Sequence, residues 1–329
     1  MEREQLKLDF LKSCNLNNVE RIKLKADASN RRYERIIASE DKSFILMDAP
    51  PEKEETIPFI KMANFLKEND FSAPLILESD SDKGFILLED FGDDSFNNIL
   101  LGKSNLSSAL SEEKIYEKAI DVLINLHAIQ SPKISLPHYS EDLLIKESNQ
   151  FIDWYVTTLN GQSLENELKE EFNLILKQLL VVTKIYPDAV VLRDYHVDNL
   201  MWLNDRVSYR KVGLLDFQDA LIGSPIYDLV SLLEDARRDV SPQLAEHMIN
   251  RYLKAHPNYS RKDFNMVYAI LAIQRNLKIA GFCARQAASN KNPFYLTLLP
   301  RVWGYINNDL KHPLLHPLKN WLSKVVSIK

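Results

Sequence analysis

Residues 193–199 read Arg-Asp-Tyr-His-Val-Asp-Asn, and residues 214–220 read Leu-Leu-Asp-Phe-Gln-Asp-Ala. Asp194 is followed five residues later by Asn199, and a second aspartate, Asp216, ends an apolar run. In-line phosphoryl transfer needs a carboxylate that accepts a hydrogen bond from the attacking hydroxyl. It also needs an amide and a carboxylate that hold Mg²⁺ against the phosphates. The spacing predicts Asp194 as the catalytic base and Asn199 and Asp216 as metal ligands.

Short apolar runs flank both motifs. Ala189–Leu192 leads into the first motif, Leu200–Leu203 leads out of it, and Val212–Leu215 delivers Asp216. Runs of this length with turn residues between them are typical of strands. Each polar residue alone is better explained as a loop or capping residue, but the set with its strands favours the phosphoryl-transfer interpretation.

The composition is that of an ordinary globular protein. The chain has 329 residues, 45% of them hydrophobic and 26% charged, with a net charge of −5. This length favours two lobes, and the charge gives no general attraction to nucleic acid or to an anionic membrane. The charged start of the chain, the lack of a long apolar run and the two isolated cysteines lead us to expect a cytoplasmic protein. The sequence does not reveal the oligomeric state, and a monomer is favoured.

The N-terminal third predicts a small sheet. A helix is expected at 2–14 and another at 58–69, and the five expected strands are 21–25, 32–38, 43–48, 75–78 and 84–88. The chain has eight glycines and none before Gly84, which excludes a Walker A loop, a dinucleotide fingerprint and a Gly-rich kinase loop at the N-terminus.

The rest of the chain is predicted to be mainly helical. The expected helices are 112–129, 141–160, 164–184, 225–237, 242–255, 261–287, 294–308 and 317–326. The fold class is therefore α+β and bilobal, with a five-stranded antiparallel N-terminal lobe and a larger helical C-terminal lobe. We place the nucleotide-binding lobe at 1–90 and the catalytic and acceptor-binding lobe at 91–329.

The chain resembles the aminoglycoside phosphotransferase and choline kinase family, which shares the protein-kinase fold. Within it, the chain is most similar to bacterial kinases of the anomeric hydroxyl of N-acetylmuramate and N-acetylglucosamine. The segments that carry the resemblance are 27–33, 46–51, 88–90, 192–199, 215–220, 227–229 and 274–278. The resemblance implies ATP and Mg²⁺ as cofactors. It also implies that Asp228 supports the catalytic loop from behind and that His127 is structural. For His196, in the same loop, a buried hydrogen bond to the backbone is favoured over a role in proton transfer.

Two departures from the family pattern matter. Leu192 stands where the family has a histidine, and the third strand, 43–48, carries no lysine for the α- and β-phosphates. The basic residues that could replace this lysine are Arg31, Arg32, Arg35 and Lys53, and the sequence does not choose among them. The missing lysine also raises a second hypothesis, a non-catalytic pseudokinase that binds nucleotide or a partner.

The nucleotide site is predicted from both lobes. The turn at Ser29 and Asn30, with Arg32, would hold phosphate in place of glycines, because asparagine tolerates left-handed backbone. The adenine would meet the backbone of Leu88, Glu89 and Asp90. Met201 is a candidate for the floor of the pocket and Ile36 for its roof, although both are equally consistent with plain core.

The acceptor site is predicted on the helix at 261–287. Arg275, Lys278, Phe282 and Arg285 recur at spacings of three and four and share one face. Basic residues beside an aromatic suit an anionic sugar, and a solvated cationic face is the alternative. The predicted function is an ATP-dependent amino-sugar kinase of cell-wall (peptidoglycan) recycling. A kinase of another small alcohol, such as an aminoglycoside, choline or homoserine, stays open.

Overall fold

The computed structural model describes residues 2–24, 30–40, 42–129, 131–161 and 163–326. They form two compact units, and each is described by itself. The first unit holds Met1–Val122 and Val197–Ala220, and the second holds Leu123–His196 and Leu221–Lys329. The lobe boundary that the sequence predicts near residue 90 stays a prediction.

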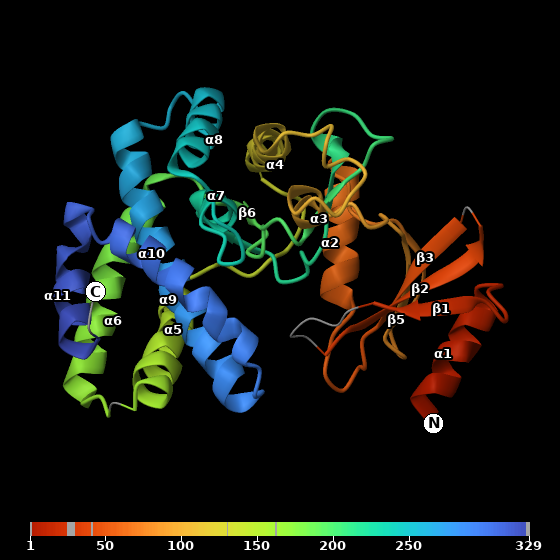
Figure 1. Cartoon of the computed structure of the whole chain (residues 1–329), viewed down its shortest axis with the longest axis horizontal. Helices are drawn as coiled ribbons and strands as arrows, with labels where there is room; N and C mark the ends of the chain where they lie inside the picture. The colour runs from red at the N-terminus through yellow and green to blue at the C-terminus, as the bar shows by residue number, and fades with distance from the viewer. Residues whose placement is uncertain (1, 25–29, 41, 130, 162, 327–329) are drawn as a thin grey trace. The chain divides into compact units, whose positions relative to one another are not determined.

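The first unit contains a five-stranded antiparallel sheet, which lies beside α1 (Glu2–Ser13) in Figure 1. Its strands are β1 (Glu20–Lys23), β2 (Arg32–Ser39), β3 (Lys42–Asp48), β4 (Ile76–Asp80) and β5 (Phe85–Glu89), in the order β1-β2-β3-β5-β4. Each predicted strand is confirmed to within two residues at either end. Alternating burial along β2 sends Glu34 and Ile36 to one face, as the two-residue period of a strand requires.

Helix α1 (Glu2–Ser13) covers that face of the sheet. Its Phe10 and Leu11 pack with Ile36, Leu46, Phe85 and Leu87 in one buried cluster. A buried ionic group adjoins the cluster: Lys7 Nζ lies 2.6 Å from Glu34 Oε1 and 3.4 Å from Asp48 Oδ2. Arg3 also pairs with Asp48, at 2.6 Å. Burial of these charges is tolerated because each one is paired.

The remaining elements of the first unit include a second strand pair. They are α2 (Ile57–Glu68), α3 (Phe96–Leu100), the start of α4 (Glu112–His127), β7 (Leu200–Trp202), a 3₁₀ turn (Ser208–Lys211) and β8 (Val212–Leu214). β7 and β8 pair antiparallel, with Leu200 opposite Leu214 and Trp202 opposite Val212. The sequence predicted this pair but not the short helix α3.

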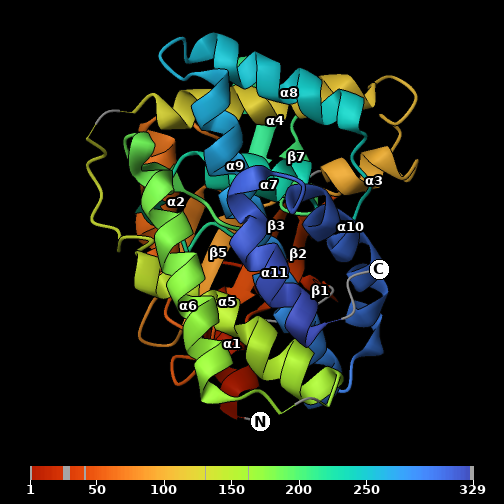
Figure 2. The same ribbon diagram turned by 90° about the vertical axis from the view of Figure 1, so that its left-hand side faces the viewer.

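The second unit is mainly helical (Figure 2). Its helices are the end of α4, α5 (Glu141–Gln150), α6 (Asn166–Leu180), α7 (Ile226–Leu233), α8 (Pro242–Ala255), α9 (Arg261–Ser289), α10 (Leu299–Asp309) and α11 (His316–Val325). Short 3₁₀ segments occupy Val181–Ile185, Pro293–Leu298 and Pro313–Leu315. A small antiparallel pair joins β6 (Ala189–Val191) to β9 (Leu221–Gly223). The loop with Asp194 begins directly after β6. The sequence did not predict β9.

Helix α9 is the central helix of this unit and packs against α5, α7 and α10. The predicted helix 141–160 changes character where α9 approaches it, because residues Phe151–Leu159 form a π-helix. At the approach point, a Cβ added to Gly281 would lie 2.3 Å from the carbonyl carbon of Gln150. Glycine is therefore the residue that lets the two backbones come this close.

Among the helices of the described residues, none combines the length and the apolar character that crossing a membrane requires.

Candidate active site

The strand pair β7–β8 brings two predicted metal ligands together. Asn199 directly precedes β7 and Asp216 follows β8, and Leu215 N–H donates to the Asn199 carbonyl across the pair at 3.0 Å. As a result Asn199 Nδ2 lies 3.4 Å from Asp216 Oδ2. Amide and carboxylate oxygens are the donors that Mg²⁺ prefers, so the donor set fits this ion.

Neighbouring residues fix the orientation of Asp216. Gln218 Nε2 donates to Asp216 Oδ1 at 2.9 Å and to Asp219 Oδ2 at 3.0 Å. Phe217 stacks on Phe59 of α2, with ring centroids 5.0 Å apart. Asp216 itself has a left-handed backbone, with φ of 57°. Sequence reasoning missed Gln218, although its place two residues after the aspartate was a usable signal.

A cation adjoins this carboxylate. Arg31 is buried, its Nη2 lies 3.1 Å from Glu54 Oε2, and its Nη1 lies 3.9 Å from Asp216 Oδ1. The half-buried Tyr33 belongs to the same group. Burial raises the pKa of its phenol to about 12, the charge of Arg31 opposes this shift and that of Asp216 adds to it. The sequence named Arg31 as one of four candidates and did not choose among them.

The loop that carries Asp194 lies in the second unit and is held by a buried carboxylate. Asp228 of α7 accepts from the backbone N–H groups of Leu192, at 2.7 Å, and Arg193, at 2.9 Å. These bonds confirm the predicted support of the loop by Asp228. Burial raises the pKa of Asp228 to about 7, although the two N–H donors favour its ionised form.

Further contacts fix Arg193, which has a left-handed backbone with φ of 71°. Its carbonyl accepts from Ser231 Oγ at 3.1 Å, and Ser231 Oγ accepts from Arg275 Nη2 at 2.8 Å. Its guanidinium pairs with Glu147, which also binds Lys278 Nζ at 2.9 Å. Arg193, the residue before the predicted base, is therefore held in place by contacts of both its backbone and its side chain.

Two histidines of the second unit, the buried His196 and the half-buried His127, have surroundings that oppose their protonation. Burial, together with the charges of Arg237 and Arg275, holds the pKa of His196 well below its usual value. Burial lowers the pKa of His127 to about 3, and its Nδ1 lies 2.9 Å from Tyr252 Oη. These environments support the predicted structural roles.

The predicted acceptor face of α9 divides into two parts. Arg275 is 5% exposed and bonded to Ser231, whereas Lys278 and Phe282 are half-buried. The rings of Phe282 and Tyr295 meet edge to face, with their centroids 5.3 Å apart. The Arg285 guanidinium carbon lies 5.5 Å from the centroid of the Phe282 ring. The acceptor contact predicted for Arg275 stays a prediction, and its burial favours a supporting role in the loop.

The predicted phosphate turn is only partly described. Ser29 lies outside the described residues. Asn30 is exposed and its N–H donates to Glu54 Oε1 at 3.1 Å. Arg32 is exposed and stands opposite Asp48 in the β2–β3 pair. Both stay predicted phosphate contacts.

Ile36 requires a correction. It was a candidate for the roof of the adenine pocket, but it is fully buried in the cluster beneath α1. Strand alternation sends Ile36 and Arg35 to opposite faces of the sheet, and α1 covers the face of Ile36. The structure therefore accounts for Ile36 as core, the alternative that the sequence had left open.

The predicted hinge is strongly anchored. Arg35 binds both carboxylate oxygens of Asp90, at 2.6 and 3.1 Å, and Ser43 Oγ donates to Asp90 at 2.7 Å. Burial opposes ionisation of Asp90, but these donors hold its pKa below the usual value. Glu89 pairs with Arg206 at 2.5 Å. The side chains of Glu89 and Asp90 are thus both held by ion pairs.

Leu88 and Met201, the other predicted adenine contacts, are both buried in the first unit. A pocket of about 240 Å³ adjoins the hinge and is lined by Glu89, Asp90, Phe91 and residues of the β7–β8 turn. The contacts of Leu88, Glu89, Asp90 and Met201 with adenine stay predictions.

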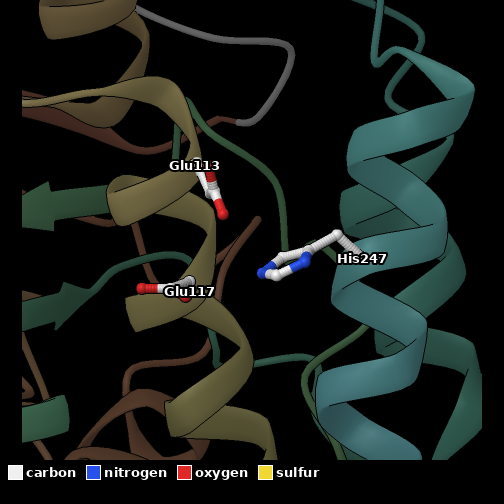
Figure 3. Close-up of side chains that lie close together, drawn as sticks. All are labelled: Glu113, Glu117 and His247. Carbon is white, nitrogen blue, oxygen red and sulfur yellow. The ribbon is translucent and has the colours of Figure 1, made fainter.

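Three further side chains of types that can bind a metal lie on helices, away from the motifs that carry Asp194 and Asp216. Figure 3 shows Glu113 and Glu117, one turn apart on α4, and His247 on α8. Glu113 and His247 are exposed and Glu117 is half-buried. Exposed acidic groups are common on proteins without a bound ion, so the pair on α4 is not by itself a metal site.

The five-stranded sheet, the mostly helical region that follows it and the paired Asn199 and Asp216 define a kinase-like class of α+β proteins. The chain belongs to the phosphotransferase enzyme family, whose sequence pattern matches residues 20–264. This membership confirms the predicted fold class and the predicted class of enzyme.

Individual relatives agree with the family. The chain is 32% identical to an N-acetylmuramate/N-acetylglucosamine kinase of Caulobacter vibrioides, over 100% of this chain and 98% of that protein. It is 33% identical to a protein of the same name from Pseudomonas aeruginosa, over 93% and 88%. The choline kinase LicA from Streptococcus pneumoniae has the same fold, with a TM-score of 0.64, 13% identity and coverage of 94% and 100%.

Proposed function

We propose that this chain is an ATP- and Mg²⁺-dependent kinase of the anomeric hydroxyl of N-acetylmuramate and N-acetylglucosamine. The observation that carries the chemistry is the Asn199–Asp216 pair at the ends of β7 and β8. The full-length relatives named for these two sugars support the choice of acceptor. The product would be a sugar 1-phosphate, which suits recycling of cell-wall sugars. We further propose that the enzyme acts in the cytoplasm as a monomer.

Asn199 and Asp216 are the proposed ligands of Mg²⁺. The ion would neutralise charge on the phosphates as the bond to the transferred group breaks. Gln218 keeps Asp216 in one orientation by its hydrogen bond to Oδ1. A carboxylate that is already oriented loses less entropy when it binds a metal.

Asp194 is the proposed base. It would accept the hydrogen bond of the anomeric hydroxyl and take its proton as the phosphorus–oxygen bond forms. Because Asp228 and Ser231 bind the backbone of the two preceding residues, the carboxylate is presented on a fixed loop. Fixed geometry is the main contribution that a protein makes to phosphoryl transfer.

Lys278 and Phe282 are the proposed acceptor contacts on α9. Both are half-buried, and Lys278 shares Glu147 with Arg193, the neighbour of Asp194. A lysine can attract the carboxylate of N-acetylmuramate, and an aromatic ring can pack on the face of a pyranose. Arg275 is a further candidate, although its burial favours support of the loop.

An acceptor screen tests the proposal. Purified protein with ATP and Mg²⁺ would be offered N-acetylmuramate, N-acetylglucosamine, choline, homoserine and an aminoglycoside, and formation of ADP would be followed. We expect turnover with the two amino sugars. Turnover with another alcohol alone would replace the acceptor and keep the kinase. Nucleotide binding without turnover on any acceptor would favour the pseudokinase hypothesis.

A further inference from the structure

We propose that Arg31 supplies the cation that binds the α- and β-phosphates of ATP, and that Glu54 orients it. This inference rests on the proposed kinase function. Kinases of this fold place such a cation on the third strand, as a lysine that pairs with a glutamate beside the metal-binding aspartate. Here β3 carries one lysine, Lys42 at its start, whose Nζ lies 5.2 Å from the centroid of the Phe44 ring, and none between Ser43 and Asp48. We therefore assign the charge to another element.

The end of β3 has a different use in this chain. Asp48 is buried and binds Arg3 and Lys7 of α1, at 2.6 and 3.4 Å. Lys7 also binds Glu34 of β2, at 2.6 Å. The strand end that could have carried the phosphate cation therefore fastens α1 to the sheet.

Arg31 has the surroundings that the missing lysine would have. It directly precedes β2, its Nη2 pairs with Glu54 at 3.1 Å, and its Nη1 lies 3.9 Å from Asp216. Its side chain is 8% exposed and that of Glu54 is 15% exposed, so water screens this ion pair only weakly. A cation paired with a glutamate, close to the proposed metal-binding aspartate, is the arrangement that binds the phosphates in kinases of this fold.

The contacts of Glu54 strengthen the assignment. Its other oxygen accepts from the backbone N–H of Asn30 at 3.1 Å, so one carboxylate binds both the arginine and the backbone of the residue before it. The guanidinium is thereby oriented before any ligand arrives. Preorganised donors bind phosphate more tightly because less side-chain entropy is lost.

The other three candidates have different surroundings. Arg35 is bound to Asp90 and Asp93 at the hinge. Arg32 and Lys53 are exposed, and Arg32 stands opposite Asp48, next to the end of β3. An exposed side chain that is not held in one orientation loses more rotamer freedom when it binds a ligand. Arg31 is thus the candidate whose burial and partners fit the role.

The test is nucleotide affinity, measured by calorimetry with ATP and Mg²⁺, ADP and Mg²⁺, and adenosine. We expect Arg31→Ala to weaken ATP and ADP about ten- to hundredfold, the effect of losing a charge-assisted hydrogen bond, and to leave adenosine unchanged. Arg31→Lys keeps the charge and should recover part of the affinity. Arg31→Gln keeps most of the length without the charge and should behave like the alanine variant.

Arg21→Ala is the matched control. Arg21 is also an arginine of the first unit that is paired with a glutamate, Glu4, at 2.5 Å, but it lies on β1 beside α1. We expect this variant to bind all three ligands as the wild type does. Circular dichroism and thermal unfolding of each variant show whether a loss of affinity comes from a loss of fold. If Arg31→Ala fails to fold, the comparison of Arg31→Lys with Arg31→Gln decides.

The outcomes separate this inference from the proposed function. Unchanged ATP affinity in folded Arg31→Ala and Arg31→Gln, with normal binding by the wild type, overturns only the role of Arg31. A large loss in Arg32→Ala instead would assign the phosphate cation to Arg32. A wild type that binds neither ATP nor ADP contradicts the proposed function itself, and the role of Arg31 fails with it.

Discussion

The first unit holds the proposed metal ligands and the second holds the proposed base, and the two are built differently. Asn199 and Asp216 are placed by an antiparallel strand pair, and the Asp216 side chain is still 41% exposed. Asp194 follows a residue in left-handed conformation, on a loop held by buried partners. Ligands of a hydrated ion must stay reachable, whereas a base needs a fixed position.

The buried anchors of the second unit offset the cost of that loop. A left-handed backbone costs a residue such as Arg193 about 1–2 kcal/mol. Two hydrogen bonds to Asp228 and one from Ser231 contribute about 1 kcal/mol each, and more where the acceptor is charged. The strained backbone is therefore affordable only while these partners are in place.

Asp216→Ala should have the largest effect. Removing this carboxylate takes away a proposed ligand of Mg²⁺, so phosphoryl transfer should fall below detection with each accepted sugar. Steady-state turnover and Mg²⁺ titration of ATP binding measure the loss. Wild-type turnover in this variant would show that the ion is held elsewhere.

Asp194→Asn should lower kcat by roughly 10²–10⁴-fold, the range for a positioned general base. The amide keeps the shape of the side chain but cannot take the proton, so the affinity for ATP should stay near that of the wild type. Asp198→Asn, four residues along the same loop, is the matched control and should keep most of the activity. An unchanged kcat in Asp194→Asn would contradict the assignment of the base.

Arg275→Ala distinguishes support of the Asp194 loop from direct contact with the sugar. If Arg275 supports the loop through Ser231, kcat should fall by about tenfold for both sugars with KM little changed. Stability should fall by about 1.5–3 kcal/mol, because a hydrogen bond from a charged donor is lost. Arg275→Lys should recover part of both losses. A rise in KM that is larger for N-acetylmuramate than for N-acetylglucosamine would instead assign Arg275 to the lactyl carboxylate.

The smallest effect concerns the stability of the second unit in acid. The pKa of His127 is lowered to about 3 by burial, so the neutral form stabilises the fold, and this contribution is lost as pH falls below about 6.5. At about pH 5 the loss amounts to about 2 kcal/mol. His127→Gln should therefore lose about 2 kcal/mol less than the wild type between about pH 7.5 and 5 in urea unfolding. Parallel losses would show that other groups dominate the acid sensitivity.

The sequence predicted the elements that have a clear local signal. The five strands of the first unit alternate or run apolar between turn residues, and Asp194, Asn199 and Asp216 stand at a diagnostic spacing. It missed β9, which has three residues, and α3, which has five, because neither is long enough to show a period. The π-helix after Gln150 also escaped prediction, since it forms where Gly281 brings α9 close.

The remaining differences depend on contacts between distant parts of the chain. Ile36 has the same local pattern whether it faces a nucleotide or α1, and only the packing of Phe10 and Leu11 decides. Arg31 could not be chosen over its neighbours until Glu54 and Asp216 were seen beside it. The burial of Arg275 depends likewise on Ser231 of α7.

The most direct test of the account is the identity of the phosphorylated product. Phosphorus NMR of a reaction with ATP, Mg²⁺ and N-acetylmuramate would follow the loss of the γ-phosphate signal and the appearance of a sugar phosphate. The account predicts a signal coupled to the anomeric proton, which marks a sugar 1-phosphate, and the same result with N-acetylglucosamine. Phosphorylation of another hydroxyl, or no sugar phosphate from either compound, would contradict it.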